Sequence, residues 1–279
     1  MRVLVASEAD EASVNQRDAL LRLTSWNANH PFHGGPAWTR GDTHLVTIRE
    51  HHLYRDRLDR DLRDHFGTAP ELVVYLSKHR SESRTPSLTV HPIGNPAGAD
   101  FGGRAGILVP AAPRWMTAAL RNLRREATGL AYAVTYEATH HGPFLETPTF
   151  YIEQGSTEKE WADRAASDAI ARALIDLEPL EAPVAIGVGG GHYVPRHSDL
   201  ALGKRIAFGH LLPAYVLPNL ADDVLAQAIA RTPGAKLAYI HRKSLTKPEA
   251  RQWEERLTDL GLRVVREADL EPDPAAKTS

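Results

Sequence analysis

The sequence predicts an α/β protein with a mixed, mostly parallel sheet flanked by helices on both faces. The first observation is a series of short apolar runs rich in β-branched residues. These runs cover 2–6, 44–48, 71–76, 106–110, 130–136, 149–153, 183–188, 236–240 and 262–265. The second observation is that segments with helical spacing of apolar residues separate most of these runs. Such alternation favours parallel strands joined by helices.

Five segments between the runs have the composition of helices. They cover 10–23, 54–67, 112–129, 156–177 and 246–261. Pro113 suits the first turn of the third helix, because its missing N–H would be unbonded there in any case. Thr157 with Glu160, and Thr246 with Glu249, have the spacing of capping boxes. These signals predict where three of the helices begin.

Length and composition fit one globular domain. The chain has 279 residues, of which 42% are hydrophobic and 24% are charged. We expect a single α/β catalytic domain over 1–270 and a disordered tail over 271–279, "EPDPAAKTS". No stretch approaches the roughly 20 apolar residues that span a bilayer. The opening "MRVLVASEAD" resembles a strand rather than a signal peptide, so we expect a cytoplasmic protein with no membrane association.

Composition also excludes several kinds of site. The absence of cysteine excludes disulfides, thiolate metal ligands and a cysteine nucleophile, so any metal must be held by His, Asp or Glu. The formal net charge of −2 does not favour general binding to nucleic acid, which would need a local basic patch. Many of the 14 histidines stand beside Gly, Ser or Pro just after apolar runs. Active sites of α/β proteins are often built this way.

Polar loops follow four of the predicted strands. They are "SKHRSES" at 77–83, "EATHHGPFLET" at 137–147, "QGSTE" at 154–158 and "GGGHYVPRH" at 189–197. Ligands of parallel sheets bind outside the carboxyl ends of the strands. We therefore expect the four loops to meet on one rim and to form the functional site.

The first loop is basic. Lys78, His79 and Arg80 stand among several hydroxyl side chains, a composition that suits contact with a phosphate or carboxylate. The alternative is a solvated surface loop.

The second loop combines imidazoles with carboxylates, at Glu137, His140, His141 and Glu146. These groups can bind a divalent metal or perform acid–base chemistry. Adjacent side chains of an extended segment point in opposite directions, so we do not expect His140 and His141 to bind the same ion. A structural role for one of the two histidines is the alternative.

The segment "GVGGGHYVPRH" at 187–197 holds three consecutive glycines. It fits neither GxxxxGK[ST] nor a GxGxxG that opens a helix, and we expect it to continue as an extended loop through Pro195. We expect the glycine amides to face a substrate and His192 to point into the pocket. The alternative is a tight strand exit with a buried, hydrogen-bonded histidine. For His210 in "GHLLPAY", a core position is expected.

Taken together, these segments resemble D-aminoacyl-tRNA deacylases of the archaeal and plant type. The resemblance rests on "LSKHRSES…SLTVHPIGN", "YEATHHGP", "TPTFYIEQGSTEKEW", "GVGGGHYVPRH" and "GHLLPAY", which occur in the family's order from the start of the chain to about residue 245. It implies hydrolysis of the ester that joins a D-amino acid to the acceptor end of tRNA. It also implies zinc dependence and a fold similar to nucleoside phosphorylases and peptidyl-tRNA hydrolases. No protein partner is implied, and we expect a monomer or a small homo-oligomer.

The residues favour direct attack by water, because the chain has no cysteine and no G-x-S-x-G elbow. Either a bound Zn²⁺ activates the water or a histidine acts as base. We predict catalytic roles for His141 and His192, with Glu146 or Glu153 orienting them. His140, His192 and Glu137 are the predicted metal ligands.

Further residues are predicted to bind substrate, the glycines at the oxyanion or terminal ribose and the cations at acceptor-stem phosphates. They are Lys78, His79, Arg80, Gly189, Gly190, Gly191, Tyr193, Arg196 and Lys204. Two other functions stay open: a nucleoside phosphorylase-like enzyme and a non-catalytic RNA-binding module.

Overall fold

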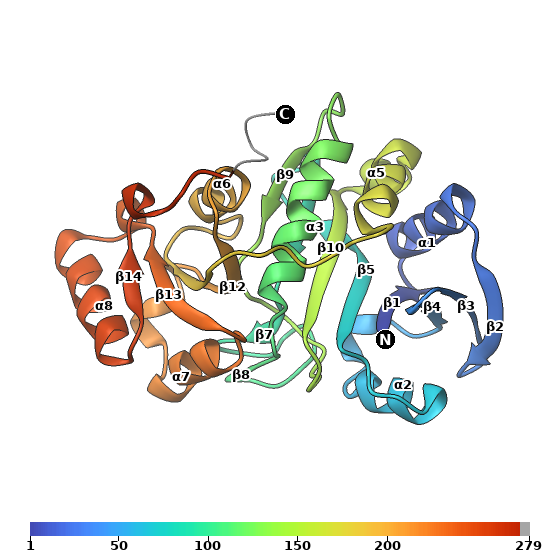
Figure 1. Ribbon diagram of the computed structural model, residues 1–279, viewed down its shortest axis with the longest axis horizontal. Coiled ribbons are helices and arrows are strands. Elements are labelled where there is room, and N and C mark those ends of the chain that lie inside the picture. The colour runs from blue at the N-terminus through green and yellow to red at the C-terminus, as the bar shows by residue number, and fades with distance from the viewer. Residues whose placement is uncertain (274–279) are drawn as a thin grey trace.

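The computed structural model describes residues 1–273 and contains two main sheets side by side (Figure 1). The first sheet has eight strands, and the pairs β1–β4, β1–β5, β5–β10 and β6–β9 are parallel. In spatial order its strands are β2 (Asn27–Phe32), β3 (Gly35–Arg40), β4 (Thr43–Ile48), β1 (Arg2–Ser7), β5 (Leu72–Arg80), β10 (Thr149–Ser156), β6 (Ser87–His91) and β9 (Ala133–Tyr136).

The second sheet has four strands, and all its pairs are parallel. Its order is β12 (Ala207–Leu212), β11 (Val184–Val188), β13 (Ala235–Ile240) and β14 (Arg263–Val265). A short antiparallel pair, β7 (Gly94–Asn95) with β8 (Ile107–Leu108), lies apart from both sheets.

Helices cover both faces of each sheet. In the first sheet, Leu4 and Val74 belong to the same apolar cluster as α1 (Glu11–Leu23), α3 (Pro113–Glu126) and α5 (Arg164–Leu174). The alternate residues Val3 and Val5 pack with α2 (Leu58–Phe66) on the opposite face, as the period of a strand requires. The short α4 (Glu158–Trp161) follows β10.

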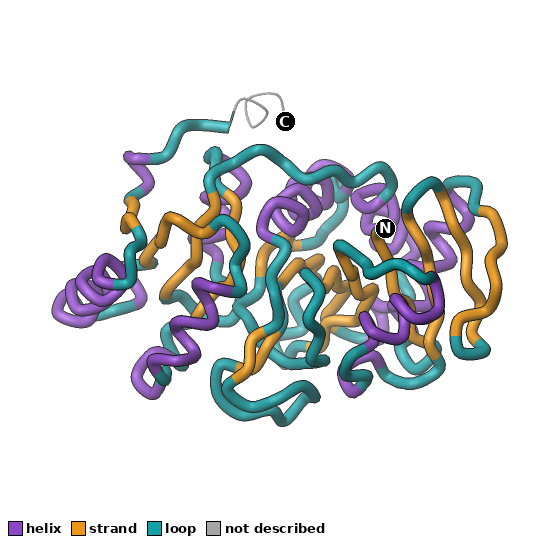
Figure 2. The backbone as a smooth tube through the Cα atoms, turned by 60° about the horizontal axis from the view of Figure 1, so that its bottom comes forward, coloured by secondary structure: helices purple, strands orange, loops and turns teal. Residues whose placement is uncertain are grey.

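The second sheet is covered in the same way. Phe208 packs with α6 (Pro195–Gly203), whereas Ile186 packs with α7 (Asp222–Ala230) and α8 (Lys247–Asp259). The cluster that contains Leu4 also contains Phe208, so one apolar core runs beneath both sheets. In Figure 2, α8 lies at one end of the molecule and the β2–β3 hairpin at the other. The predicted α/β architecture is confirmed.

Most of the predicted elements are present. Each predicted apolar run overlaps a strand, and both capping boxes form, at Thr157 and at Thr246. The segment 156–177 contains two helices rather than one, because Asp163 caps the start of α5. The prediction of an extended loop through Pro195 is wrong: Pro195 opens α6, where a helix tolerates its missing N–H.

Other elements were not anticipated. The hairpin β2–β3 lies at the sheet edge, and β2 is largely exposed, so it lacks the apolar alternation of a buried strand. β6, β12 and α7 were also missed. Within the predicted tail, the backbone N–H of Arg205 donates to the carbonyl of Glu271 (2.8 Å), and Asp273 forms an ion pair with Arg121. Residues 274–279 lie outside the described part of the chain.

No helix within residues 1–273 combines the length and the apolar character that crossing a bilayer requires.

Ser198 joins α6 to β9 and so fixes the two segments that enter the site described below. Its buried Oγ accepts the N–H of Tyr136 at 2.9 Å and lies 2.8 Å from the Thr135 hydroxyl. Ser198→Ala would leave the buried Tyr136 N–H without a partner. We expect it to lower the free energy of unfolding by about 1–3 kcal/mol in urea titrations. The exposed Ser25→Ala is the control, and equal stability of the two variants would contradict this role.

Candidate active site

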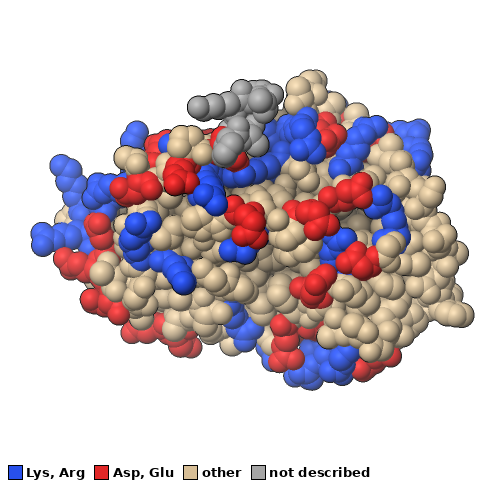
Figure 3. Space-filling model, in the orientation of Figure 1, with Lys and Arg blue, Asp and Glu red and all other residues tan. Residues whose placement is uncertain are grey.

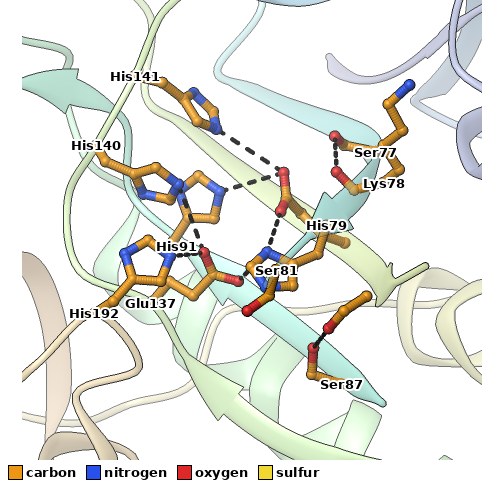
Figure 4. A network of polar contacts seen from close by, with 12 residues as sticks. Ser77, Lys78, His79, Ser81, Ser87, His91, Glu137, His140, His141 and His192 are labelled. Atoms are coloured by element: carbon orange, nitrogen blue, oxygen red, sulfur yellow. Dashed lines mark hydrogen bonds and ion pairs between the residues drawn. The ribbon is translucent and has the colours of Figure 1, made fainter. Parts of the chain in front are cut away.

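Five imidazoles and two carboxylates from separate segments meet in one cluster, called here the His–Glu cluster (Figure 4). His79 is the last residue but one of β5, His91 ends β6, and Glu153 lies within β10. Glu137 directly follows β9, and His140 and His141 lie in the loop after it. His192 follows β11 of the second sheet. Three of the four predicted polar segments contribute side chains to the cluster. The segment 154–158 contributes none; Glu153, directly before it, and His91 of β6 complete the cluster.

Strand pairing explains part of the cluster. Glu153 of β10 lies opposite Ser77 of β5 and Thr89 of β6, and Tyr151 lies opposite His91. Paired residues on neighbouring strands point to the same face of a sheet. Gly155 lies opposite His79, and a Cβ there would approach the His79 carbonyl oxygen to 2.4 Å. Glycine at 155 therefore avoids a clash with the backbone of His79.

Glu137 is fully buried and touches three imidazoles. Its Oε2 lies 2.8 Å from His192 Nε2 and 3.5 Å from His140 Nε2, and its Oε1 lies 3.1 Å from His79 Nδ1. Burial alone would raise the pKa of this carboxyl group. Contact with His192 and the charge of His79 outweigh burial and hold the pKa below its usual value, so Glu137 is a carboxylate.

Glu153 has a similar environment. Its Oε2 lies 3.4 Å from His79 Nδ1, and its Oε1 lies 3.5 Å from His91 Nε2 and 3.9 Å from His141 Nε2. Burial opposes ionisation, but these contacts lower the pKa of Glu153 well below its usual range. The predicted role of Glu153, to orient histidines, agrees with these contacts.

His79 bridges the two carboxylates. Burial would lower its pKa, but its hydrogen bond with Glu153 and the charges of Glu137 and Glu153 raise the pKa to about 10. His79 is therefore an imidazolium at neutral pH, and its Nε2 lies 2.9 Å from the Tyr193 hydroxyl. Because its charge is satisfied inside the protein, His79 is part of the cluster rather than a surface anchor for phosphate.

Three histidines share a feature of metal ligands. The Nδ1 atoms of His91, His140 and His141 each contact a backbone carbonyl, at 3.1, 2.8 and 2.6 Å. If each Nδ1 carries the proton of that hydrogen bond, each Nε2 keeps a lone pair. One ring nitrogen from each histidine lies within 4.8 Å of those of the other two, and the buried His91 Nε2 has no hydrogen-bond partner among residues 1–273.

Burial, with the charges of neighbouring histidines, lowers the pKa of His140 and of His141. Both are therefore neutral, which is the form that binds metal. For His91, burial has the same effect, but contact with Glu153 outweighs it and raises the pKa.

The expectation that His140 and His141 point apart is wrong. Their ring centroids lie 4.3 Å from one another, and a ring nitrogen of each belongs to the same group of three. The expectation assumed an extended chain, whereas His141 has a φ of +46°. This left-handed conformation, uncommon outside glycine, turns both side chains to one side.

Two other groups could hold an ion: His79 with Glu137 and His192, and His91 with Glu137 and Glu153. The predicted ligands His140, His192 and Glu137 touch one another through the Glu137 carboxylate. These three residues do not all belong to one of the possible metal-binding groups. His140 belongs to the group with His91 and His141, whereas Glu137 and His192 belong to the group with His79.

Glu146 lies outside the cluster, contrary to its predicted catalytic role. Its carboxylate pairs with Arg60 at 2.7 Å on the surface, and its side chain is 57% exposed. The chain must travel from His141 back to the amino end of β10, which begins at Thr149. Glu146 is on that return path.

Two of the three glycine amides are also unavailable to a substrate. Gly189 N–H donates to the Leu212 carbonyl (2.8 Å), and Gly190 N–H donates to Ser244 Oγ (2.7 Å). Their predicted role at an oxyanion is therefore wrong. Gly191 is exposed, and a Cβ there would meet nothing within 4 Å.

The predicted cations lie in different places. Lys78 and Arg80, beside His79, lie 5.1 and 4.6 Å from the centroid of the Trp161 ring. Arg196 pairs with Glu267 near the start of α6. Lys204 follows the other end of α6, where its carbonyl accepts a hydrogen bond from Arg121 (2.7 Å). Only the first two lie next to a cluster residue in the sequence.

His91 and its support were missed. No strand was predicted at 87–91, where the short β6 ("SLTVH") ends at His91. The rings of His91 and His141 lie against Tyr151, with centroids 5.4 and 4.8 Å away. The Tyr151 hydroxyl contacts His52 Nδ1 (3.1 Å), and His52 Nε2 contacts Asp10 (3.3 Å). This buried chain of contacts, with no motif in the sequence, holds Tyr151 beneath the cluster.

The second sheet is tied to the cluster by hydrogen bonds. The Ala138 N–H donates to the His192 carbonyl (2.7 Å). His210 is buried, with Nδ1 3.1 Å from Thr139 Oγ1 and Nε2 3.0 Å from the Val109 carbonyl oxygen, so its predicted core position is confirmed.

Comparisons with known proteins place the cluster in a family. The sequence model of D-aminoacyl-tRNA deacylase matches residues 66–265, which contain every residue of the His–Glu cluster. A Methanosarcina mazei protein of that name is 39% identical over 96% of this chain and 92% of its own length. Its Pyrococcus horikoshii namesake is 36% identical over 96% of this chain and 100% of its own.

Some relatives are longer. The chain spans 57% of the Methanococcoides burtonii D-aminoacyl-tRNA deacylase, at 38% identity, and 60% of the Methanoculleus marisnigri protein, at 39%.

A crystal structure of a conserved protein of unknown function superposes with a TM-score of 0.89 and 29% identity, covering 97% of this chain and 96% of the other. This chain belongs to the D-aminoacyl-tRNA deacylase family.

Proposed function

We propose that the chain hydrolyses the ester bond of D-aminoacyl-tRNA and releases a free D-amino acid and tRNA. The observation that supports this most is the contact of His192 with Glu137, inside the region that matches the family. The reaction needs a base for water, a donor for the oxyanion and a proton for the leaving ribose oxygen. As an enzyme of charged tRNA, it would act in the cytoplasm.

His192 is the proposed base. Its side chain is 36% exposed and can meet substrate, while Glu137 is fully buried. With the proton on Nε2, which lies 2.8 Å from Glu137 Oε2, Nδ1 can take a proton from water as the water oxygen attacks the ester carbonyl carbon. The carboxylate stabilises the resulting imidazolium and fixes its tautomer. His192 then returns the proton to the ribose oxygen as the ester bond breaks.

Tyr193 is the proposed oxyanion donor, in place of the glycine amides. His79 is protonated and can donate Nε2–H to the Tyr193 oxygen. The Tyr193 O–H, which the Ser81 and Ser83 hydroxyls also contact, would turn from them to donate to a carbonyl oxygen that gains negative charge. A donor polarised by a neighbouring cation is stronger than a neutral one.

We also propose that His91, His140 and His141 hold Zn²⁺. Their contacts to backbone carbonyls and the closeness of their ring nitrogens fit three nitrogen ligands. To bind the ion, His91 has to give up the proton that its contact with Glu153 favours. When bound, zinc would supply a Lewis acid near the ester. The His192–Glu137 pair uses none of these three side chains, so it can act with or without the ion.

We expect His192→Ala and Glu137→Gln each to reduce turnover of D-tyrosyl-tRNA by about 10²–10⁴-fold, because each removes part of the proposed base. His30→Ala, at an exposed histidine of β2, is the control and should match wild type. Thermal unfolding of each variant checks that the fold is intact. Near-normal turnover by either site variant would rule out this base.

The same assay separates the alternatives, with L-tyrosyl-tRNA and a nucleoside plus phosphate as further substrates. A phosphorylase-like enzyme would consume only the nucleoside, and a binding module would consume none.

Zinc binding is tested without an activity readout. We expect the dialysed protein to retain zinc in elemental analysis, and His91→Ala and His141→Ala each to lose at least ten-fold in zinc affinity, because each removes a ligand. His30→Ala should retain wild-type affinity. Unchanged zinc binding in His91→Ala would reject this ligand set. Full activity after complete removal of zinc would show that the His192–Glu137 pair suffices.

A further inference from the structure

A second concave site lies beside the His–Glu cluster. It is a cavity of about 550 Å³ lined by residues at the start of α6 and at the carboxyl ends of β13 and β14. Figure 1 labels these three elements. Pro195 and Arg196 line it from α6, and Tyr239 and His241 line it from the end of β13. Carboxyl ends of parallel strands are where α/β sheets bind ligands. The volume is within the range of small-molecule sites.

Cations predominate in this cavity. Arg196, Arg242, Lys243 and Arg266 line it, against two anions, Asp199 and Glu267. The field is positive enough to affect a neighbour: burial and the charges of Arg196 and Lys243 lower the pKa of His241. Over the face of the molecule that Figure 3 shows, cations and anions are interspersed.

Most of these cations are held in place, but one is free. Arg196 pairs with Glu267, Arg242 pairs with Glu254, and Arg266 lies 4.0 Å from Glu254. Lys243 is exposed and has no ion pair with any residue of 1–273. A guanidinium has five N–H donors, so an Arg held by one carboxylate still has donors for a ligand. The cavity therefore offers positioned guanidinium groups and a mobile ammonium to an anion.

The cavity and the cluster are connected through the backbone and through a hydrogen bond between their loops. Arg196 is three residues from Tyr193, so their Cα atoms are at most about 11 Å apart. Ser244, next to Lys243, accepts the Gly190 N–H at 2.7 Å. The loop that presents His192 is thus hydrogen-bonded to the loop that presents Lys243. A single ligand can therefore occupy the cavity and the His–Glu cluster together if it is a chain long enough to span both.

We propose that this cavity binds the phosphates of the unpaired 3′ end of the RNA that lie nearest the terminal ribose. This inference rests on the proposed function, which puts the ester of the terminal ribose at His192. The next phosphates along the strand then have to lie nearby, and Arg196 brings this cationic cavity within three residues of Tyr193. With a net charge of −2, the chain as a whole does not attract RNA, so contact has to be local. The partly exposed ring of His241 can pack against a sugar or base.

The test compares charge reversals at two lysines, one within β13 and one in the turn that follows it. Lys243→Glu changes the cavity, and Lys236→Glu changes an exposed residue near the start of β13, at the other end of the strand. Binding of uncharged tRNA is measured by fluorescence anisotropy between 50 and 200 mM salt. We expect Lys243→Glu to weaken binding at least ten-fold and Lys236→Glu to bind like wild type. Lys243→Ala should reduce the slope of log K against log salt by about 0.7, one phosphate contact on a single strand.

A second arm locates the contact. With tRNA that lacks the unpaired 3′ nucleotides, wild type and Lys243→Glu should bind alike. If Lys243→Glu still weakens binding of the truncated tRNA ten-fold, the cavity contacts the duplex and the proposal fails. Equal affinities of Lys243→Glu and Lys236→Glu for intact tRNA would also overturn it.

Turnover separates this inference from the proposed function. Lys243→Glu should raise KM for D-aminoacyl-tRNA by the same factor as Kd and leave kcat within about two-fold, because the reacting groups are unchanged. If wild type hydrolyses D-aminoacyl-tRNA and Lys243→Glu has an unchanged KM, the phosphate site in the cavity is rejected and the deacylase activity is supported. If wild type does not hydrolyse D-aminoacyl-tRNA but Lys243→Glu shows the expected binding defect, the deacylase activity is rejected and the phosphate site is supported.

Discussion

The candidate site depends on the burial of two carboxylates among imidazoles. Glu137 and Glu153 are removed from water, and the buried charges must be compensated inside the protein. His79 provides the central compensation, because its Nδ1 lies within 3.4 Å of both groups and its pKa is raised to about 10. Each neighbouring feature supports this arrangement: Gly155 makes room for His79, Tyr151 lies beneath His91 and His141, and Ser198 joins α6 to β9. The cluster is therefore held by the first sheet and completed by His192 from the second.

That division assigns separate tasks to the two sheets. The first sheet supplies the buried charges and the three histidines suited to metal. The second supplies the half-exposed His192 and Tyr193, at the point where substrate can enter. Hydrogen bonds from Ala138 to His192 and between Thr139 and His210 keep the two parts in register. The cationic cavity at the start of α6 gives the second sheet another proposed task, which is to bind the phosphates of the substrate. A long substrate with its reactive ester at one end and phosphates behind it suits this layout.

Much of the fold and part of the site could be predicted from sequence, for identifiable reasons. Buried strands such as β5 and β11 are continuous apolar runs, and the capping boxes at Thr157 and Thr246 depend only on local spacing. Rules about strand ends brought Glu137, His141, Glu153 and His192 together correctly. Local rules failed where the chain departs from regular geometry or where distant segments decide the outcome. The φ of +46° at His141 reverses the expected alternation. The partners of the Gly189 and Gly190 amides come from β12 and from the turn after β13. His91 was missed because a short strand between loops lacks a signal of its own.

The central claim is that His192 and Glu137 act as one unit on the ester. A double-mutant cycle on kcat/KM for D-tyrosyl-tRNA measures this directly, with His192→Ala, Glu137→Gln and the double variant. If the carboxylate acts only through the imidazole, the double variant loses no more activity than His192→Ala alone. If the two losses multiply, the residues act independently, and the pairing of a buried carboxylate with an exposed base does not explain the catalysis.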